Sequence, residues 1–181
     1  MRRRGFVEAA AGAAAALLLG GHTPYGQWVV YRRKHLLIGC HRRDPQTYAL
    51  ARLVVDVLDA HLAAAEARVA RAPAPSRLAS LLATDQLDVA VLGWDDAQAM
   101  AAGKGVFAAY GAISLGVLAP VVGRVLVAHD RLPARHAWLV CAALAGDDLV
   151  AAAQAPGDMP LGWHAGAAAF RAGDPEPAPE E

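Results

Sequence analysis

The chain has few cysteines and no excess of either charge. Its 181 residues contain two cysteines, and 17 lysine and arginine residues balance 17 aspartate and glutamate residues. Two cysteines are too few for a zinc ribbon or an iron–sulfur cluster. A protein that binds nucleic acid in bulk would show a marked basic excess. The composition therefore argues against these classes, and we expect no nucleic-acid partner.

The sequence also lacks the common motifs of nucleotide binding and nucleophilic catalysis. It contains no G-x-G-x-x-G, no G-x-x-x-x-G-K-[ST] and no G-x-S-x-G. Its seven histidines form no H-x-x-x-H or H-x-H pair, and a lone histidine is more often a surface or core residue than a metal ligand. We therefore expect no enzymatic activity, no cofactor and no metal site.

Both cysteines lie in apolar surroundings, Cys40 in "LLIGCH" and Cys141 in "WLVCAAL". The favoured interpretation is two small buried hydrophobic residues. A disulfide between them is the alternative, and it requires closely placed Cβ atoms and an oxidising compartment.

The first 21 residues, "MRRRGFVEAAAGAAAALLLGG", predict an export signal. Arg3 and Arg4 precede Phe6 in a pattern that resembles a twin-arginine signal. The apolar stretch that follows has about 13 residues, too short for a hydrocarbon core of about 30 Å but typical of a signal peptide. We expect a periplasmic protein. An alanine-rich soluble helix is the less favoured interpretation, because no face of this stretch is polar.

Residues 22–34 are interpreted as a linker. They do not decide whether the signal is cleaved. No clean A-x-A site ends the apolar run, and Tyr25, Trp28 and Tyr31 precede three basic residues. Such a belt is typical of a membrane surface. An uncleaved signal that anchors the protein is therefore the alternative to a cleaved one.

The rest of the chain alternates between strand and helix patterns. Apolar runs predict strands over 35–40 and 87–94, and one or two strands within 113–130. The segment "ARVARA" at 67–72 is expected to be a further short strand. Helices are expected over 46–64 and after the caps Ser76 and Asp95, and Pro133 is expected to open another helix. This order predicts an α/β fold for residues 35–171, with a mainly parallel sheet flanked by helices. Residues 172–181 read as a disordered acidic tail.

Helical spacing predicts which residues pack on that sheet. Asp44 is expected to cap the first helix, with Pro45 at its first position. From there one apolar stripe contains Leu50, Leu53, Val54, Val57, Leu58 and Leu62. Of these we expect Leu50, Leu53, Val57 and Leu58 to pack against the sheet.

Two loops of the predicted sheet carry the candidate binding site, because ligands bind at the carboxyl ends of parallel strands. In the loop at 40–45, Arg42 and Arg43 would attract a carboxylate, helped by helix amides near Pro45. In the loop at 93–96, Trp94 would stack on the ligand and Asp95 would orient it. The full candidate set is Cys40, His41, Arg42, Arg43, Asp44, Tyr48, Trp94 and Asp95.

These site residues also have plainer interpretations, which the sequence leaves open. The arginines can be solvated beside Asp44, Trp94 can pack in the core at the end of a strand, and Asp95 can serve as a helix cap. No group in the set is by itself diagnostic of a ligand.

Several segments resemble one family of transport proteins. They are "LLIGC", "YALARL", "RLASLLATDQLDVAVLGWDDAQAMAAG", "LPARHAWLVCAAL" and "PLGWHAGAAAFR". Together they resemble the TAXI family, the solute-binding subunits of a class of TRAP transporters with a type II periplasmic-binding-protein fold. The resemblance implies an exported protein that holds a small, anionic organic ligand for a membrane transporter subunit.

Two departures from the family pattern modify that expectation. Family members have two lobes, but here "RVLVAHD" runs almost directly into "RLPARHAW", where the second lobe would belong. The family's first loop is usually glycine-rich, whereas "CHRRDPQ" is bulky and basic. We therefore expect a single lobe. The alternative function is an exported accessory protein that uses the face left by the missing lobe to bind a protein partner.

Overall fold

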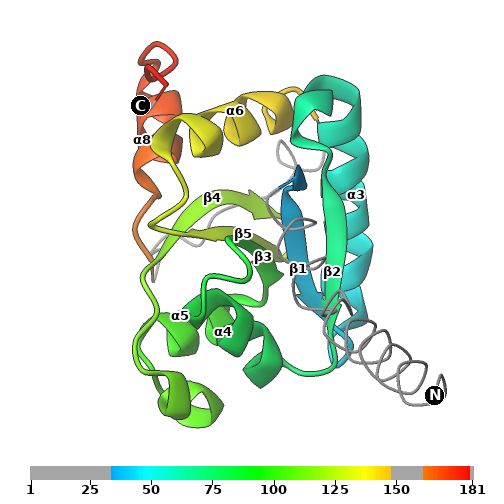
Figure 1. Cartoon of the computed structure of the whole chain (residues 1–181), viewed down its shortest axis with the longest axis vertical. Helices are drawn as coiled ribbons and strands as arrows, with labels where there is room; N and C mark the ends of the chain where they lie inside the picture. Colours follow the sequence, from blue (N-terminus) through cyan, green and yellow to red (C-terminus); the bar gives the residue numbers. More distant parts are fainter. Residues whose placement is uncertain (1–33, 148–160, 180–181) are drawn as a thin grey trace, which may run out of the picture. The chain divides into compact units, whose positions relative to one another are not determined.

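The computed structural model describes residues 34–147 and 161–179, all within the compact unit Lys34–Glu181. The predicted signal and all but the last residue of the predicted linker lie outside the described residues. The described strands are β1 (Leu37–His41), β2 (Arg68–Ala72), β3 (Val89–Leu92), β4 (Leu115–Val121) and β5 (Arg124–His129). The α-helices are α3 (Pro45–His61), α4 (Pro75–Ala83), α5 (Trp94–Ala101), α6 (Ala134–Leu144) and α8 (Ala165–Ala172), with short 3₁₀ turns at Ala63–Ala65 and Gly105–Tyr110 (Figure 1).

The strands form one mixed sheet in the order β2-β1-β3-β5-β4. The pairs β1–β2 and β1–β3 are parallel, whereas β3–β5 and β4–β5 are antiparallel. Val121 pairs with Arg124, so only Val122 and Gly123 join β4 to β5, and a turn this short joins only antiparallel strands. The α/β class is confirmed, with its parallel part in β2, β1 and β3.

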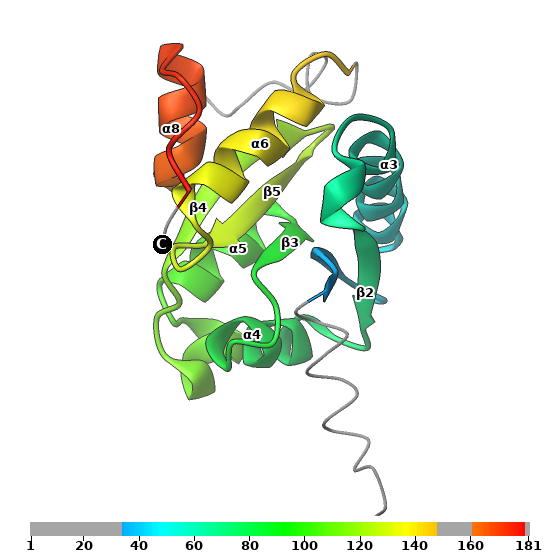
Figure 2. The same cartoon turned by 45° about the horizontal axis from the view of Figure 1, so that its top comes forward.

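Helices cover both faces of this sheet and give two core layers. The first core layer contains buried residues of α3, α6 and α8, including Leu58, Cys141 and Ala167. The second contains buried residues of α4 and α5 and the 3₁₀ turn at Gly105–Tyr110. Figures 1 and 2 show α4 and α5 lying together, apart from α3, α6 and α8. Burial on both faces explains the near-continuous apolar runs of β1, β3 and β4.

Helix α3 begins as predicted but buries only part of the predicted apolar stripe. Asp44 is its N-cap and Pro45 its first residue. The buried line is Leu50, Val54 and Leu58, spaced by four, whereas Leu53 is 48% exposed. The prediction that Leu53 is buried is wrong, because the apolar stripe is wider than the part of α3 that faces the sheet.

Two predicted helix caps are also wrong. Helix α4 begins at Pro75, one residue before Ser76, with Ala74 as its N-cap. Helix α5 begins at Trp94 with Gly93 as its N-cap, so Asp95 lies within the first turn. Proline with its fixed φ suits the first helical position, and an acidic residue inside the first turn is favoured by the helix dipole.

Helix α8 is an additional element that periodicity does not reveal, because five of its eight residues are alanine. It packs against α6, and Gly166 lies where a side chain would meet the Ala134 carbonyl group. Residues 174–179 follow without regular secondary structure. Here Arg135 pairs with Glu176 at 2.6 Å, and Trp138 Nε1 donates to the Asp174 carbonyl oxygen at 3.2 Å.

Both cysteines are buried and free, which confirms their interpretation as small hydrophobic residues. Burial raises the pKa of the Cys40 thiol to about 11, although the Arg71 charge opposes this. Burial likewise raises the pKa of Cys141 to about 12. Both thiols are therefore protonated at neutral pH and unreactive as nucleophiles.

Candidate functional site

The two loops of the candidate site meet at the carboxyl ends of β1 and β3. These strands are adjacent and parallel, with Ile38 opposite Val89, so their following loops leave the same edge of the sheet. His41 ends β1, and its Nε2 lies 3.6 Å from Oδ2 of Asp96 in the first turn of α5. We call the group His41, Arg42, Arg43, Asp44 and Asp96 the strand-end site.

His41 is the most buried polar group of this site. It is 2% exposed, and neither ring nitrogen has a hydrogen-bond partner within the described residues. Its backbone is held by Thr47, whose hydroxyl accepts from the His41 amide at 3.4 Å and donates to the Asp44 carbonyl oxygen at 2.7 Å. An imidazole that is buried without a hydrogen bond carries a desolvation cost, which the nearby Asp96 carboxylate offsets in part.

Asp96 faces His41, where the sequence had pointed to Asp95. Because α5 begins at Trp94, the side chain of Asp96 turns toward β1, whereas Asp95 is exposed. Asp96 keeps 39% of its side chain exposed, so water reaches the carboxylate next to the buried imidazole.

Asp44 links the first loop to the hairpin of β4 and β5. Its Oδ1 accepts from the Gln46 amide at 3.0 Å, and its Oδ2 pairs with Arg124 Nε at 2.7 Å. Burial raises the pKa of Asp44, but the hydrogen bond and charge of Arg124 outweigh this, so the pKa lies below its usual value. Arg124 is a residue of the site's surroundings that sequence reasoning missed.

This arrangement predicts a pH-dependent loss of stability in Asp44→Asn. The variant keeps a capping side chain but loses the ion pair, and we expect it to unfold about 1 kcal/mol more easily at pH 7. A carboxyl with a lowered folded-state pKa stabilises above its unfolded-state pKa, and the contribution disappears as the pH falls through the folded-state value. We therefore measure urea unfolding of the parent and the variant at pH 7 and at a pH below the folded-state pKa of Asp44. The difference in their free energies of unfolding should shrink at the lower pH.

Asp56→Asn is the matched control for this measurement, because Asp56 is an exposed residue of the same helix, and no ion pair is found for it within the described residues. It should change the free energy of unfolding little at either pH. A loss in Asp44→Asn that is equally large at both pH values would show that the ion pair to Arg124 does not stabilise the fold.

Arg42 and Arg43 are the uncommitted charges of the site. Both are exposed, and neither side chain has an ion pair or hydrogen bond within residues 34–147 and 161–179. The Arg42 amide donates to the Ala72 carbonyl oxygen at 3.0 Å, which fixes the loop backbone while the side chains stay free.

The amides expected near Pro45 are not available to a ligand. Pro45 has no N–H, and Asp44 already accepts from the amides of Gln46 and Thr47 through its side chain and carbonyl oxygen. Any attraction for an anion at this loop therefore comes from Arg42 and Arg43.

The remaining candidate residues lie away from the His41 side chain. Successive residues of a strand point to opposite faces, so Cys40 packs in the first core layer while His41 faces α5. Tyr48 packs against that first layer and carries Arg71 over its ring, 4.6 Å from the centroid. Trp94 is half-buried and packs against the second core layer.

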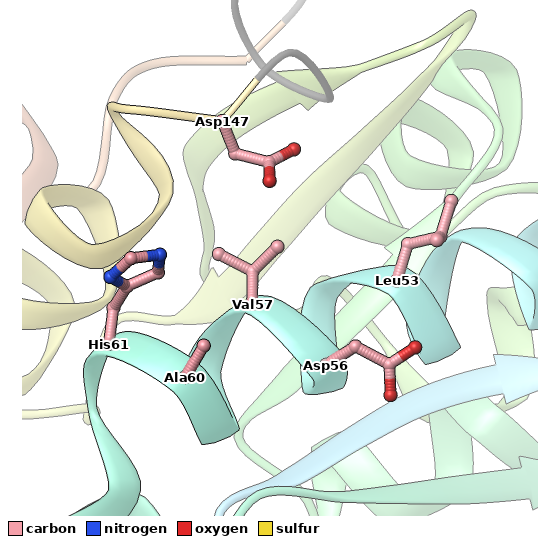
Figure 3. Close-up of a pocket in the computed structure, with 6 residues that line it drawn as sticks. All are labelled: Leu53, Asp56, Val57, Ala60, His61 and Asp147. Carbon is pink, nitrogen blue, oxygen red and sulfur yellow. The ribbon is translucent and has the colours of Figure 1, made fainter.

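A separate groove of about 410 Å³ runs along the C-terminal half of α3. Figure 3 shows Leu53 and Val57 rising from α3 toward Asp147, with His61 beyond them. This groove explains why Leu53 is exposed. It shares no residue with the strand-end site, whose first loop precedes the N-terminus of α3.

Within the described residues, no group of three or more His, Cys, Asp or Glu side chains is arranged to hold a metal ion. In the same part of the chain, no helix combines the length and apolar character needed to cross a bilayer.

Comparison with known proteins assigns no family to this arrangement. No protein-family model matches the chain, and no curated protein matches it.

Proposed function

We propose that this chain is an exported binding protein whose strand-end site holds a small organic anion. The observation that carries the proposal is the pair of free, exposed guanidinium groups of Arg42 and Arg43 beside the buried, unsatisfied imidazole of His41. A carboxylate would accept charge-assisted hydrogen bonds from the two arginines, while the buried His41 ring lies against the Asp96 carboxylate below them. The resemblance to TAXI proteins supports transfer of this ligand to a membrane transporter subunit.

The single lobe sets the expected strength of binding. A ligand at this edge touches one set of loops and keeps much of its surface in water, whereas a typical pocket buries most of a ligand. We therefore expect weak binding that depends mainly on charge and falls as salt rises.

A thermal-shift screen of small mono- and dicarboxylates on the full chain tests the site. The acid that stabilises the parent most should lose at least about tenfold in affinity in the double variant Arg42→Ala/Arg43→Ala. Arg52→Ala is the matched control, because Arg52 is an exposed arginine of α3 away from the loop. Equal stabilisation of the parent and the double variant by every responding acid would place the anion site elsewhere.

Export is tested at the N-terminus. Replacing Arg3 and Arg4 with lysine should strongly reduce the amount of protein that leaves the cytoplasm, because twin-arginine export depends on that pair. Cell fractionation measures the effect, and an unchanged exported yield would rule out the twin-arginine route.

A second candidate function is binding of a protein partner at the same edge. Val122, in the turn between β4 and β5, is 54% exposed and lies two residues from Arg124, which pairs with Asp44. An exposed apolar residue beside charged loops is a feature of interface surfaces. Size-exclusion chromatography of cell extracts separates the two functions: a stable complex supports a protein partner, and a monomer stabilised by an acid supports a solute.

A further inference from the structure

A half-enclosed hollow of about 190 Å³ lies between β4, α6 and α8. Its walls are mainly apolar side chains of the first core layer and of the segment leading into α8. The walls include Leu118, Leu144, Trp163 and Phe170, with Cys141 and Arg171 as the two polar contributions. The hollow shares no residue with the strand-end site, so it is an independent feature of the fold.

A β-bulge shapes the inner wall of the hollow. Leu118 is the extra residue between the paired positions Val117 and Ala119, and its carbonyl oxygen accepts a hydrogen bond from Cys141 Sγ at 3.4 Å. The thiol is protonated, because burial holds its pKa far above neutral. The inner wall therefore presents no charge and suits an apolar group.

The rim of the hollow carries a free cation. Arg171 lies in the last turn of α8, with its guanidinium carbon 4.1 Å from the centroid of the Trp163 ring. It is exposed, and no carboxylate pairs with it within the described part of the chain. A guanidinium over an indole ring keeps N–H groups at its edge available for a carboxylate.

We propose that this hollow binds a small aromatic monocarboxylate, with the ring inside and the carboxylate on Arg171. The volume fits one ring, since an apolar protein cavity of about 150 Å³ binds benzene. Inside the hollow, the ring would contact Phe170 and the Cys141 sulfur, both favourable partners for an aromatic group. Charge complementarity at the rim then selects an acid over a neutral aromatic compound.

Calorimetric titration of the full chain with benzoate tests this proposal, with benzyl alcohol as the uncharged probe of the same size. We expect benzoate to bind once per chain and benzyl alcohol to bind at least about tenfold more weakly. Arg171→Gln should reduce benzoate affinity by a similar factor and leave benzyl alcohol unaffected. Arg52→Gln removes an exposed arginine of α3 and should change neither.

Ala145→Phe tests the hollow itself, because Ala145 is an exposed lining residue at the end of α6. A phenyl ring there should occupy the mouth and abolish binding of both probes, while circular dichroism confirms that the variant is folded. Absence of benzoate binding, or equal binding by the parent and Arg171→Gln, would overturn the proposal. Loss of binding in Arg42→Ala/Arg43→Ala with retention in Arg171→Gln would assign benzoate to the strand-end site and also overturn it.

Discussion

Replacing Leu58 with alanine is expected to lower the free energy of unfolding by about 2–5 kcal/mol. Leu58 lies on the buried line of α3 and is 0% exposed. It belongs to the first core layer, in which α3 contacts both the sheet and α6. Truncation removes its buried methyl groups and leaves a cavity. The surrounding side chains and backbone relax into this cavity only in part. Chemical denaturation of the parent and the variant measures the loss.

Leu53→Ala is the matched control, because it makes the same chemical change five residues earlier in the same helix. Leu53 is 48% exposed and lines the open groove along α3, so we expect a cost below about 1 kcal/mol. Equal costs for the two variants would mean that α3 is rotated about its axis relative to the arrangement described above.

Leu53 and Leu58 show which features of the fold can be predicted from the sequence and which cannot. Periodicity identifies α3, its Asp44 cap and its apolar side, because these depend on local spacing and local chemistry. It does not identify which half of a wide apolar stripe faces the sheet. That depends on the elements that pack against α3, which are the strands β1, β2 and β3 and the helix α6.

The antiparallel direction of β4 and β5 is likewise not determined by the composition of the strands themselves. Strands β4 and β5 are apolar throughout their centres, as parallel buried strands also are, so composition does not distinguish the two directions. The informative signal is the pair Val122-Gly123, where Gly123 adopts φ 72°. A glycine at the second position of a two-residue connection is typical of a hairpin turn.

The sequence predicted where the two loops of the candidate site meet, but not all of the residues that lie there. Two apolar strands that each end in a polar loop predict that the loops at 40–45 and 93–96 converge, and β1 and β3 are indeed neighbours. Asp96 was missed because α5 starts at Trp94, which shifts the side chain that faces His41 by one position. Arg124 was missed because it is 80 residues from Asp44, and only the hairpin brings the two together.

Replacing Gly166 with alanine is expected to destabilise the fold by about 1–3 kcal/mol, although it places a better helix former in a helix. A Cβ at this position would overlap the Ala134 carbonyl oxygen and lie 2.8 Å from the Ala137 Cβ. These atoms belong to the first turn of α6, and backbone yields less readily than a flexible side chain. The variant therefore forces α8 away from α6 along the contact that Gly166 makes possible.

Gly162→Ala is the matched control, since an added Cβ there meets no atom within 4 Å. It should leave the midpoint of urea unfolding almost unchanged, whereas Gly166→Ala should lower it. The sign of the effect is decisive, because helix propensity alone would make Gly166→Ala more stable than the parent by up to about 1 kcal/mol. A stabilised Gly166→Ala would contradict the close approach of α6 and α8. Because α6 and α8 also form two walls of the hollow beside Arg171, the same variant should weaken benzoate binding if that hollow is the site.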